Sequence, residues 1–181
     1  DFIDNEGQVM YFKTDLDAPR HRVIAIDTRK PERAAWKEII PQGKDLLQGV
    51  SMTGGQLFCE WLRDARSAMT AHDLDGKLIR DIKLPGIGST GGFGGRRKDT
   101  KTFYSFTGFT DPGAIYRYDI ATGESTLWTR YKVDFDGDAY ETKQVFYQSK
   151  DGTKVPMFIT HKKGLVLGGN NPPLMYGYGG F

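Results

Sequence analysis

The residues best suited to chemistry lie at the end of the sequence, in the run PPLMYGYGGF from Pro172 to Phe181. Its glycines allow tight turns and close approach of the backbone to a ligand. Acyl transfer puts negative charge on a carbonyl oxygen, which a fixed donor about 3 Å away stabilises. The hydroxyl of a tyrosine beside the glycines could be that donor. The alternative is that Tyr176 and Tyr178 fill a core, with their hydroxyls bonded to nearby backbone.

The preceding residues must position this run, and they predict a hairpin. QVFYQS and VPMFITHKK alternate as strands do, and SKDGTK between them contains the Asp-Gly pair of a tight turn. LVLGGNNPP predicts a loop, and PLMYGYGGF is expected to begin as a buried apolar strand and to end in the glycine turn. A hairpin followed by a strand and a glycine-rich loop resembles the start of an α/β-hydrolase sheet, in which such a loop supplies an oxyanion donor.

A repeat runs through the earlier part of the chain. Phe12, Phe58 and Tyr104 occupy the same place in VMYFKTD, QLFCEWL and TFYSFTG, and they are 46 residues apart (58 − 12 and 104 − 58). Each unit predicts three or four short strands separated by Gly, Pro and Asp, which is typical of a β-propeller blade. The first unit is expected to lack its innermost strand, because only DFIDNEG precedes Val9. The chain is therefore expected to be cut inside a blade, as part of a longer protein.

An aspartate recurs in the same frame, at Asp27, Asp73 and Asp119. Each precedes a turn, where its carboxylate can accept a hydrogen bond from the backbone two residues on, so we expect a structural role. The frame fails after Lys132, since the position expected to hold an aromatic strand, near 150 (104 + 46), falls in the turn SKDG. Residues 1–132 are therefore assigned to propeller blades, and residues 133–181 to the first strands of an α/β-hydrolase domain.

Composition excludes several classes of function. Lys+Arg 25 against Asp+Glu 23 gives a net charge of +2, which offers no reason to expect nucleic acid or an acidic membrane surface as a partner. No apolar run reaches the ~18 residues of a membrane span. The single cysteine, Cys59, excludes an internal disulfide and is expected to be a buried, inert thiol. A cytoplasmic location is expected, with the periplasm as the alternative.

Several motifs have the form of functional sites without the required context. Gly86, Gly88 and Gly91 fit G-x-G-x-x-G but lead into a strand rather than a helix, so a blade is expected there instead of a dinucleotide site. DFDGDAYE lacks the ligand spacing of a calcium loop and predicts an acidic linker. The histidines lack the spacing of metal ligands; they are His21, His72 and His161. We expect neither a cofactor nor a metal.

The whole chain resembles the prolyl oligopeptidase family. QVFYQSKDGTKVPMFITHKKG and PPLMYGYGGF are similar to the start of its catalytic domain, and KDTKTFYSFTGFTDPGAIYRYDI is similar to its last propeller blades. The resemblance implies a serine peptidase that cleaves short peptides on the carboxyl side of proline. It also implies an α/β-hydrolase domain capped by a seven-bladed propeller that acts as a size filter. The fold class is therefore mostly β, with about three blades followed by the first hydrolase strands.

The resemblance assigns two site residues. Tyr178 is expected to donate its phenolic hydroxyl to the oxyanion, and Phe181 to line the S1 pocket for the proline ring. Tyr176 is expected only to pack. The sequence contains no G-x-S-x-G and no triad, so this segment alone is expected to be inactive and its partners to be proline-containing short peptides and the rest of the same enzyme. The alternative is a non-enzymatic β-propeller that binds peptides or proteins, with the glycine-rich end as a linker.

Overall fold

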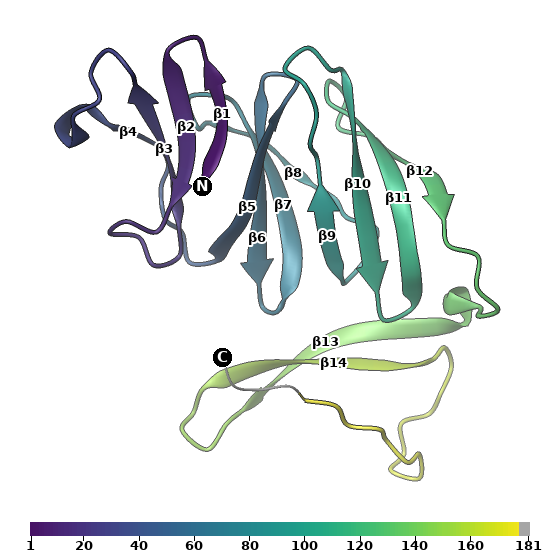
Figure 1. The fold of residues 1–181 in the computed structure, drawn as a ribbon. Coiled ribbons are helices and arrows are strands. Elements are labelled where there is room, and N and C mark those ends of the chain that lie inside the picture. The colour runs from purple at the N-terminus through teal and green to yellow at the C-terminus, as the bar shows by residue number, and fades with distance from the viewer. Residues whose placement is uncertain (178–181) are drawn as a thin grey trace.

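The computed structural model describes residues 1–177, which contain fourteen β-strands and two short 3-10 turns (Figure 1). The first sheet is formed by β1 (Phe2–Glu6), β2 (Val9–Thr14), β3 (Arg22–Asp27) and β4 (Lys37–Ile40). The second is formed by β5 (Leu46–Thr53), β6 (Gln56–Arg63), β7 (Arg66–His72) and β8 (Leu78–Ile82). The third is formed by β9 (Ser89–Gly92), β10 (Lys101–Gly108), β11 (Asp111–Asp119) and β12 (Ser125–Arg130).

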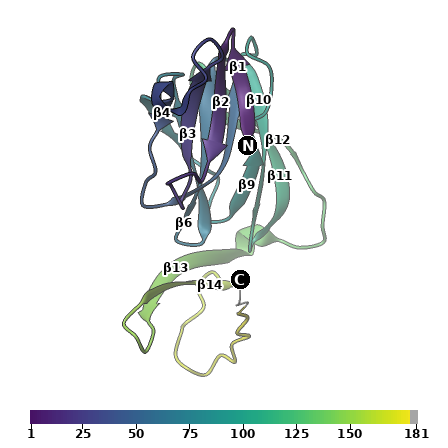
Figure 2. The same cartoon turned by 60° about the vertical axis from the view of Figure 1, so that its left-hand side comes forward.

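Each of these sheets has its strands in chain order and pairs them antiparallel, as the blades of a propeller do. We refer to them as the first, second and third blades. They lie face to face in the order of the sequence, and the view turned by 60° shows them stacked behind one another (Figure 2). A hairpin of β13 (Tyr140–Gln148) and β14 (Lys154–Lys162) lies below their lower ends, across the stack. Nothing within residues 1–177 forms a helix that is both long and apolar enough to cross a bilayer.

The first blade is complete, so the expectation that it lacks its innermost strand was wrong. β1 pairs with β2 through Asn5↔Met10 and Glu6↔Val9, around a turn in which Gly7 has a positive φ of 58°. A bulge between Phe2 and Asp4 interrupts the alternation of β1. The polar run DFIDNEG therefore hides a strand, because a bulge shifts the face on which the following side chains lie.

The second blade is buried on both faces. Successive side chains of a strand point to opposite sides, and on β6 Leu57 and Cys59 pack against the first blade while Phe58 packs against the third. All three side chains are almost fully buried. Burial of such a side chain contributes about 1.5–3 kcal/mol, so packing between sheets supplies much of the stability of the stack.

Stacked aromatic rings join the second and third blades. The Phe93 ring lies between those of Phe58 and Tyr104, with centroid distances of 5.2 and 4.7 Å. Phe93 has a φ of 58°, an uncommon value for a residue with a side chain. Its carbonyl oxygen accepts hydrogen bonds from the hydroxyls of Ser51 and Thr53 in the second blade. The ring packing and these bonds stabilise the left-handed conformation, which places the ring in the core.

The recurring aspartates have the structural role that the sequence predicts. Asp27 Oδ1 accepts a hydrogen bond from the backbone N–H of Arg29, and Asp73 Oδ1 accepts one from Asp75. Asp119 Oδ1 accepts from the two residues Ala121 and Thr122. The prediction of a side-chain cap on each turn is therefore confirmed in all three blades.

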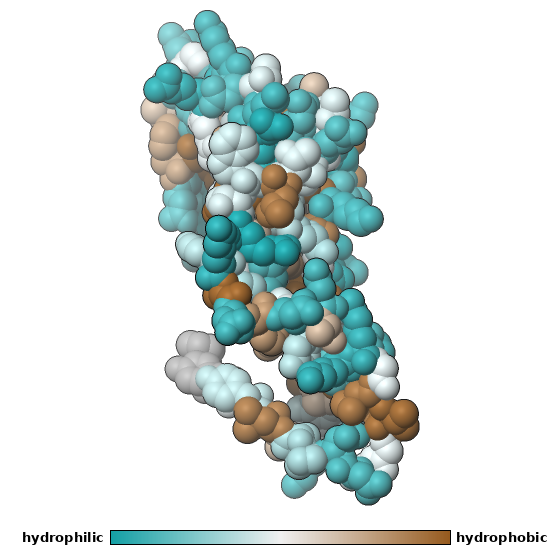
Figure 3. All heavy atoms as spheres, turned by 90° about the vertical axis from the view of Figure 1, so that its right-hand side faces the viewer, coloured by the Kyte–Doolittle hydropathy of each residue, from teal (hydrophilic) through white to brown (hydrophobic). Residues whose placement is uncertain are grey.

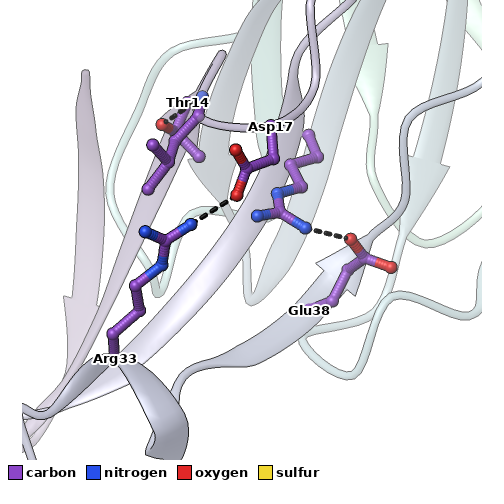
Figure 4. A network of polar contacts seen from close by, with 6 residues as sticks. Thr14, Asp17, Arg33 and Glu38 are labelled. Carbon is purple, nitrogen blue, oxygen red and sulfur yellow. Dashed lines mark hydrogen bonds and ion pairs between the residues drawn. The ribbon is translucent and has the colours of Figure 1, made fainter.

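Two ion pairs connect strands and loops at the outer edge of the first blade (Figure 4). Arg33, in the 3-10 turn Arg33–Ala35, pairs with Asp17 in the loop after β2. Arg22 of β3 pairs with Glu38 of β4 at 2.9 Å. These exposed ion pairs contribute at most about 1 kcal/mol each, so they orient the loop more than they stabilise the fold.

The face of the third blade that points away from the second carries apolar side chains among polar ones (Figure 3). Trp128 contacts Phe103 edge-on at 5.5 Å, and the guanidinium of Arg117 lies 5.5 Å from the Trp128 ring. Both aromatic residues remain largely exposed. The side chain of Arg117 therefore covers part of the apolar surface that Trp128 presents on this face.

Candidate functional site

A linker of residues 131–139 carries the chain from the third blade to the hairpin. It contains the acidic run of the sequence and ends in a 3-10 turn, Gly137–Ala139, at whose start the Asp136 side chain accepts a 3.1 Å hydrogen bond from the backbone N–H of Asp138. A Cβ atom at Gly137 would lie 2.0 Å from the carbonyl oxygen of Thr110. Glycine is therefore required for the linker to approach the β10–β11 turn this closely.

A cavity of about 750 Å³ lies between this linker, the third blade and the hairpin. Its polar wall contains Arg130, whose guanidinium pairs with the Asp111 carboxylate at 3.1 Å. The Asp111 carboxylate raises the pKa of Arg130, with a further contribution from its hydrogen bond to Tyr116. Its apolar wall includes Phe106 and Phe135. A cavity with charged and aromatic walls between the third blade and the hairpin can admit a polar ligand or water, although these residues alone supply no reactive group.

The hairpin forms as the sequence predicts. β13 and β14 pair in register from Tyr140↔Lys162 to Gln148↔Lys154. The turn between them places Gly152 at a φ of 84°, and the Asp151 carboxylate accepts a hydrogen bond from the backbone N–H of Thr153. The Asp-Gly pair therefore specifies this turn, and the strands carry the chain toward the glycine-rich end.

The segment after β14 differs from the sequence prediction. It was expected to enter a buried apolar strand, but Leu174 is 98% exposed and Met175 is 89% exposed, and neither lies in a strand. A strand needs a neighbouring ladder for its backbone groups, and none of the strands in residues 1–177 pairs with these residues. Their apolar side chains accordingly find no core in the described chain.

The two predicted site residues, Tyr178 and Phe181, lie outside the described residues. Tyr176 is 85% exposed, so the expectation that it packs in a core was wrong. It also lies in the segment after β14, which forms no strand within residues 1–177.

The described residues contain no activated nucleophile. Burial raises the pKa of the Cys59 thiol to about 12, which keeps it protonated and unreactive, as the sequence predicts. In residues 1–177 no histidine ring bonds a serine or cysteine; His21 and His161 bond backbone carbonyls, and His72 bonds Thr70 and a carbonyl. No group of three or more His, Cys, Asp or Glu in this part of the chain is arranged to hold a metal ion.

Sequence reasoning missed the residues that join the hairpin to the propeller. Arg66 of the second blade and Gln144 of β13 hydrogen-bond each other although they are 78 residues apart in the chain. Neither lies in a motif, and no periodic pattern connects them. The only available sequence signal was the polar Gln144 within the predicted strand QVFYQS, which is compatible with a contact to a neighbouring surface.

Comparison with known proteins identifies the architecture. The family described as "Prolyl oligopeptidase, N-terminal beta-propeller domain" matches residues 1–131. A prolyl endopeptidase from Elizabethkingia meningoseptica is 40% identical over 178 residues, which cover 98% of this chain and 25% of that protein. A dual function macrocyclase-peptidase from Galerina marginata is 35% identical over 99% of this chain and 25% of its own length. This chain thus spans about a quarter of the length of these relatives.

Solved structures give the same result. A chain from a structural study of two prolyl endopeptidases superposes with a TM-score of 0.79 at 43% identity, over 90% of this chain and 24% of that one. Prolyl oligopeptidase B from Galerina marginata superposes with a TM-score of 0.81 at 32% identity, over 91% of this chain and 24% of that one. The resemblance read from the sequence is confirmed: this chain belongs to the prolyl oligopeptidase family, and its residues 1–131 match that family's N-terminal β-propeller domain.

Proposed function

We propose that this chain joins the β-propeller to the catalytic domain in a serine endopeptidase that hydrolyses short peptides on the carboxyl side of proline. The observation that carries the proposal is the extent of the similarity to proteins named prolyl endopeptidase. It covers 98% of the chain and therefore continues past the blades into the hairpin and the glycine-rich run. A match confined to the blades would support only a shared fold.

Each part of the chain has a role in this proposal. The three blades belong to a seven-bladed propeller that excludes folded proteins from the active site. The hairpin begins the sheet of an α/β-hydrolase domain. Tyr178 donates a hydrogen bond to the oxyanion formed when a serine attacks the scissile carbonyl, and Phe181 lines the S1 pocket. The serine, aspartate and histidine of the triad would come from other parts of the enzyme, so this segment alone is inactive.

The proposed substrates are proline-containing peptides short enough to pass the propeller. Support comes from a relative, since prolyl oligopeptidase B of Galerina marginata has been solved with 25mer and 35mer peptide substrates bound. The proposed partner of this segment is the remainder of the same enzyme. We place the enzyme in the cytoplasm, because a single buried cysteine suits a reducing compartment.

The proposal is tested by replacing Tyr178 with Phe in the full-length protein. We expect kcat for a proline-containing reporter peptide to fall by about 10²–10³, the usual effect of removing one oxyanion donor. Tyr176→Phe is the matched control, because it removes a hydroxyl two residues away that has no proposed role, and it should leave kcat unchanged.

Two outcomes would contradict the proposal. A fall in kcat of less than about threefold for Tyr178→Phe would remove the oxyanion role. A full-length protein without a G-x-S-x-G motif and without turnover of the reporter would favour a propeller that only binds peptides or proteins.

A further inference from the structure

The side-chain amide of Gln144 in β13 forms two hydrogen bonds, one through its nitrogen and one through its oxygen, to the β6–β7 turn of the second blade. Its Nε2 donates a 2.5 Å hydrogen bond to the carbonyl oxygen of Asp64, and its Oε1 accepts a 3.2 Å bond from Nε of Arg66. Asp64 and Ala65 form the two-residue turn between β6 and β7, since the ladder closes at Arg63↔Arg66. In such a turn the carbonyl of the first turn residue has no partner in the ladder, so Gln144 supplies one.

This turn has an uncommon backbone conformation. Asp64 has a φ of 50° and Ala65 a φ of 60°, so both residues have a left-handed backbone conformation. Two-residue turns of this kind favour glycine at the second position, because a Cβ atom disfavours positive φ. The β6–β7 turn has alanine there and is therefore strained at the place where the hairpin binds it. Strain in a turn that makes a contact between domains points to a function for the contact.

A second contact joins the hairpin to the neighbouring blade. Phe158 of β14 packs its ring against Phe109 in the β10–β11 turn of the third blade, with centroids 5.5 Å apart. Beside this ring pair is a small cavity of about 290 Å³, lined also by Ala65 and Arg66 of the strained turn. The polar and aromatic contacts thus border the same space, although they come from different blades.

The two contacts are linked across the hairpin. Gln144 and Phe158 are direct partners in the β13–β14 ladder, so their side chains lie on the same face, about 5 Å apart at Cβ. One cross-strand pair therefore binds the lower ends of two adjacent blades, where Figure 1 shows β13 and β14 crossing below them. The hairpin cannot leave the propeller without breaking both contacts.

We propose that Gln144 and Phe158 form a clasp that holds the hairpin against the second and third blades. Under the proposed function, the hairpin carries the catalytic domain with it. Breaking the clasp allows the two parts to separate. The clasp as a conformational device stands on these contacts alone. Its effect on which peptides are admitted rests on the proposed function, because only a peptidase would need its propeller to separate from its active site.

The clasp is tested by hydrogen–deuterium exchange of the linker, residues 131–139, in the full-length protein. The linker packs between the third blade and the hairpin, so its amides exchange faster when the two separate. We expect Gln144→Ala and Phe158→Ala each to raise the exchange rate by about tenfold, as expected for the loss of one such contact. Gln148→Ala is the matched control, since Gln148 lies on the same strand, is exposed, and forms no side-chain hydrogen bond to the propeller within residues 1–177. It should leave the rate unchanged.

The double variant Gln144→Ala/Phe158→Ala tests whether the two contacts open together as one clasp or open independently of each other. If both contacts must break in a single opening, the factors of the two substitutions multiply, to about a hundredfold. A double variant that exchanges no faster than the faster single variant would overturn the clasp. Gln144→Glu keeps the acceptor for Arg66 but replaces the donor to the Asp64 carbonyl, so it should also raise the exchange rate without removing the side chain from the strand.

A kinetic readout tests the consequence for substrates. We expect the alanine variants to raise kcat/KM for a 25-residue proline-containing peptide relative to a short reporter by about fivefold or more. Faster exchange with unchanged relative kcat/KM would overturn the role of the clasp in admission. If the protein turns over no peptide at all, the proposed function fails, whereas the exchange rates still decide whether the clasp exists.

Discussion

Trp61 and Thr70 lie on neighbouring strands of the second blade, and the indole Nε1–H of Trp61 donates a 2.8 Å hydrogen bond to the Thr70 hydroxyl. The same hydroxyl lies 2.9 Å from Nε2 of His72, whose Nδ1 lies 3.0 Å from the carbonyl oxygen of Gly76. A carbonyl only accepts, so Nδ1 carries a proton, and in the neutral ring Nε2 accepts from Thr70. One hydroxyl therefore satisfies two buried side chains.

We expect Thr70→Val to lower the free energy of unfolding by about 2–4 kcal/mol. Valine has the same shape but leaves both the Trp61 indole and His72 Nε2 without a partner, and each unsatisfied buried group costs about 1–3 kcal/mol. Urea unfolding followed by tryptophan fluorescence measures the loss. Thr126→Val, the same change on an exposed strand, should stay within about 0.5 kcal/mol. Equal effects of the two substitutions would show that the network does not stabilise the blade.

A second prediction concerns the contact between the first and second blades at Gly76. This glycine has a φ of 88°, and a Cβ atom there would lie 1.8 Å from the carbonyl oxygen of Ile39 in the first blade. We expect Gly76→Ala to destabilise the protein by about 2–4 kcal/mol, from backbone strain and from separation of the blades. Gly7→Ala is the control, because Gly7 also has a positive φ but open space around it, and it should cost only about 1 kcal/mol. Thermal or urea unfolding of both variants distinguishes collision from strain.

A third prediction concerns acid stability and the Asp27 turn. Hydrogen bonds from the Arg29 side chain and backbone lower the pKa of Asp27 from 3.8 to about 2. A lowered pKa means that the ionised carboxylate stabilises the folded state, so this contribution is complete above pH 3.8 and disappears as the pH falls toward about 2. Asp27→Asn should therefore reduce stability at neutral pH and should converge with the unchanged protein near pH 2. A difference that stays constant between pH 7 and pH 2 in urea titrations would contradict it.

A fourth prediction tests the S1 pocket and rests on the proposed function. Phe181→Ala in the full-length protein removes an aromatic wall against which a proline ring would pack. We expect the preference for proline over alanine at the cleavage site to fall by about tenfold or more, the range for loss of one apolar contact. The ratio of kcat/KM values for two matched reporter peptides measures it. An unchanged ratio would place Phe181 outside the pocket.

Local patterns account for the parts of the fold that the sequence predicts well. The strand centred on Tyr104 alternates clearly between buried and exposed side chains, and the aspartates mark turns through hydrogen bonds to the backbone a few residues on. The family resemblance was drawn from motifs along the whole chain, and the comparison that confirmed it also covers 98% of the chain. Features that depend on neighbours were missed. β1 is hidden by a bulge, and the run through Leu174 needs a partner strand that residues 1–177 do not supply.

The candidate site was predictable only in part, for a physical reason. The roles of Tyr178 and Phe181 came from the family resemblance and stay predictions. The clasp could not be predicted, because the Gln144–Asp64 bond spans 80 residues and depends on a carbonyl that the β6–β7 turn exposes. Every residue has a backbone carbonyl, so the sequence does not show which carbonyl is exposed to accept a hydrogen bond. Contacts of this kind follow only from the arrangement of the blades.

Each blade completes its own ladder from one continuous stretch of chain, with no strand exchanged between blades in the part of the chain that the structure describes. A tandem duplication of one 46-residue period, the spacing from Asp27 to Asp73 (73 − 27), would therefore insert a whole sheet without breaking any strand pairing. The stacked surfaces and the angle between neighbouring blades would have to adapt, and ring pairs such as Phe58 and Phe93 fill the space where two blades meet. The ladder thus permits the number of blades to change in evolution, and the side chains between sheets decide which blades can become neighbours.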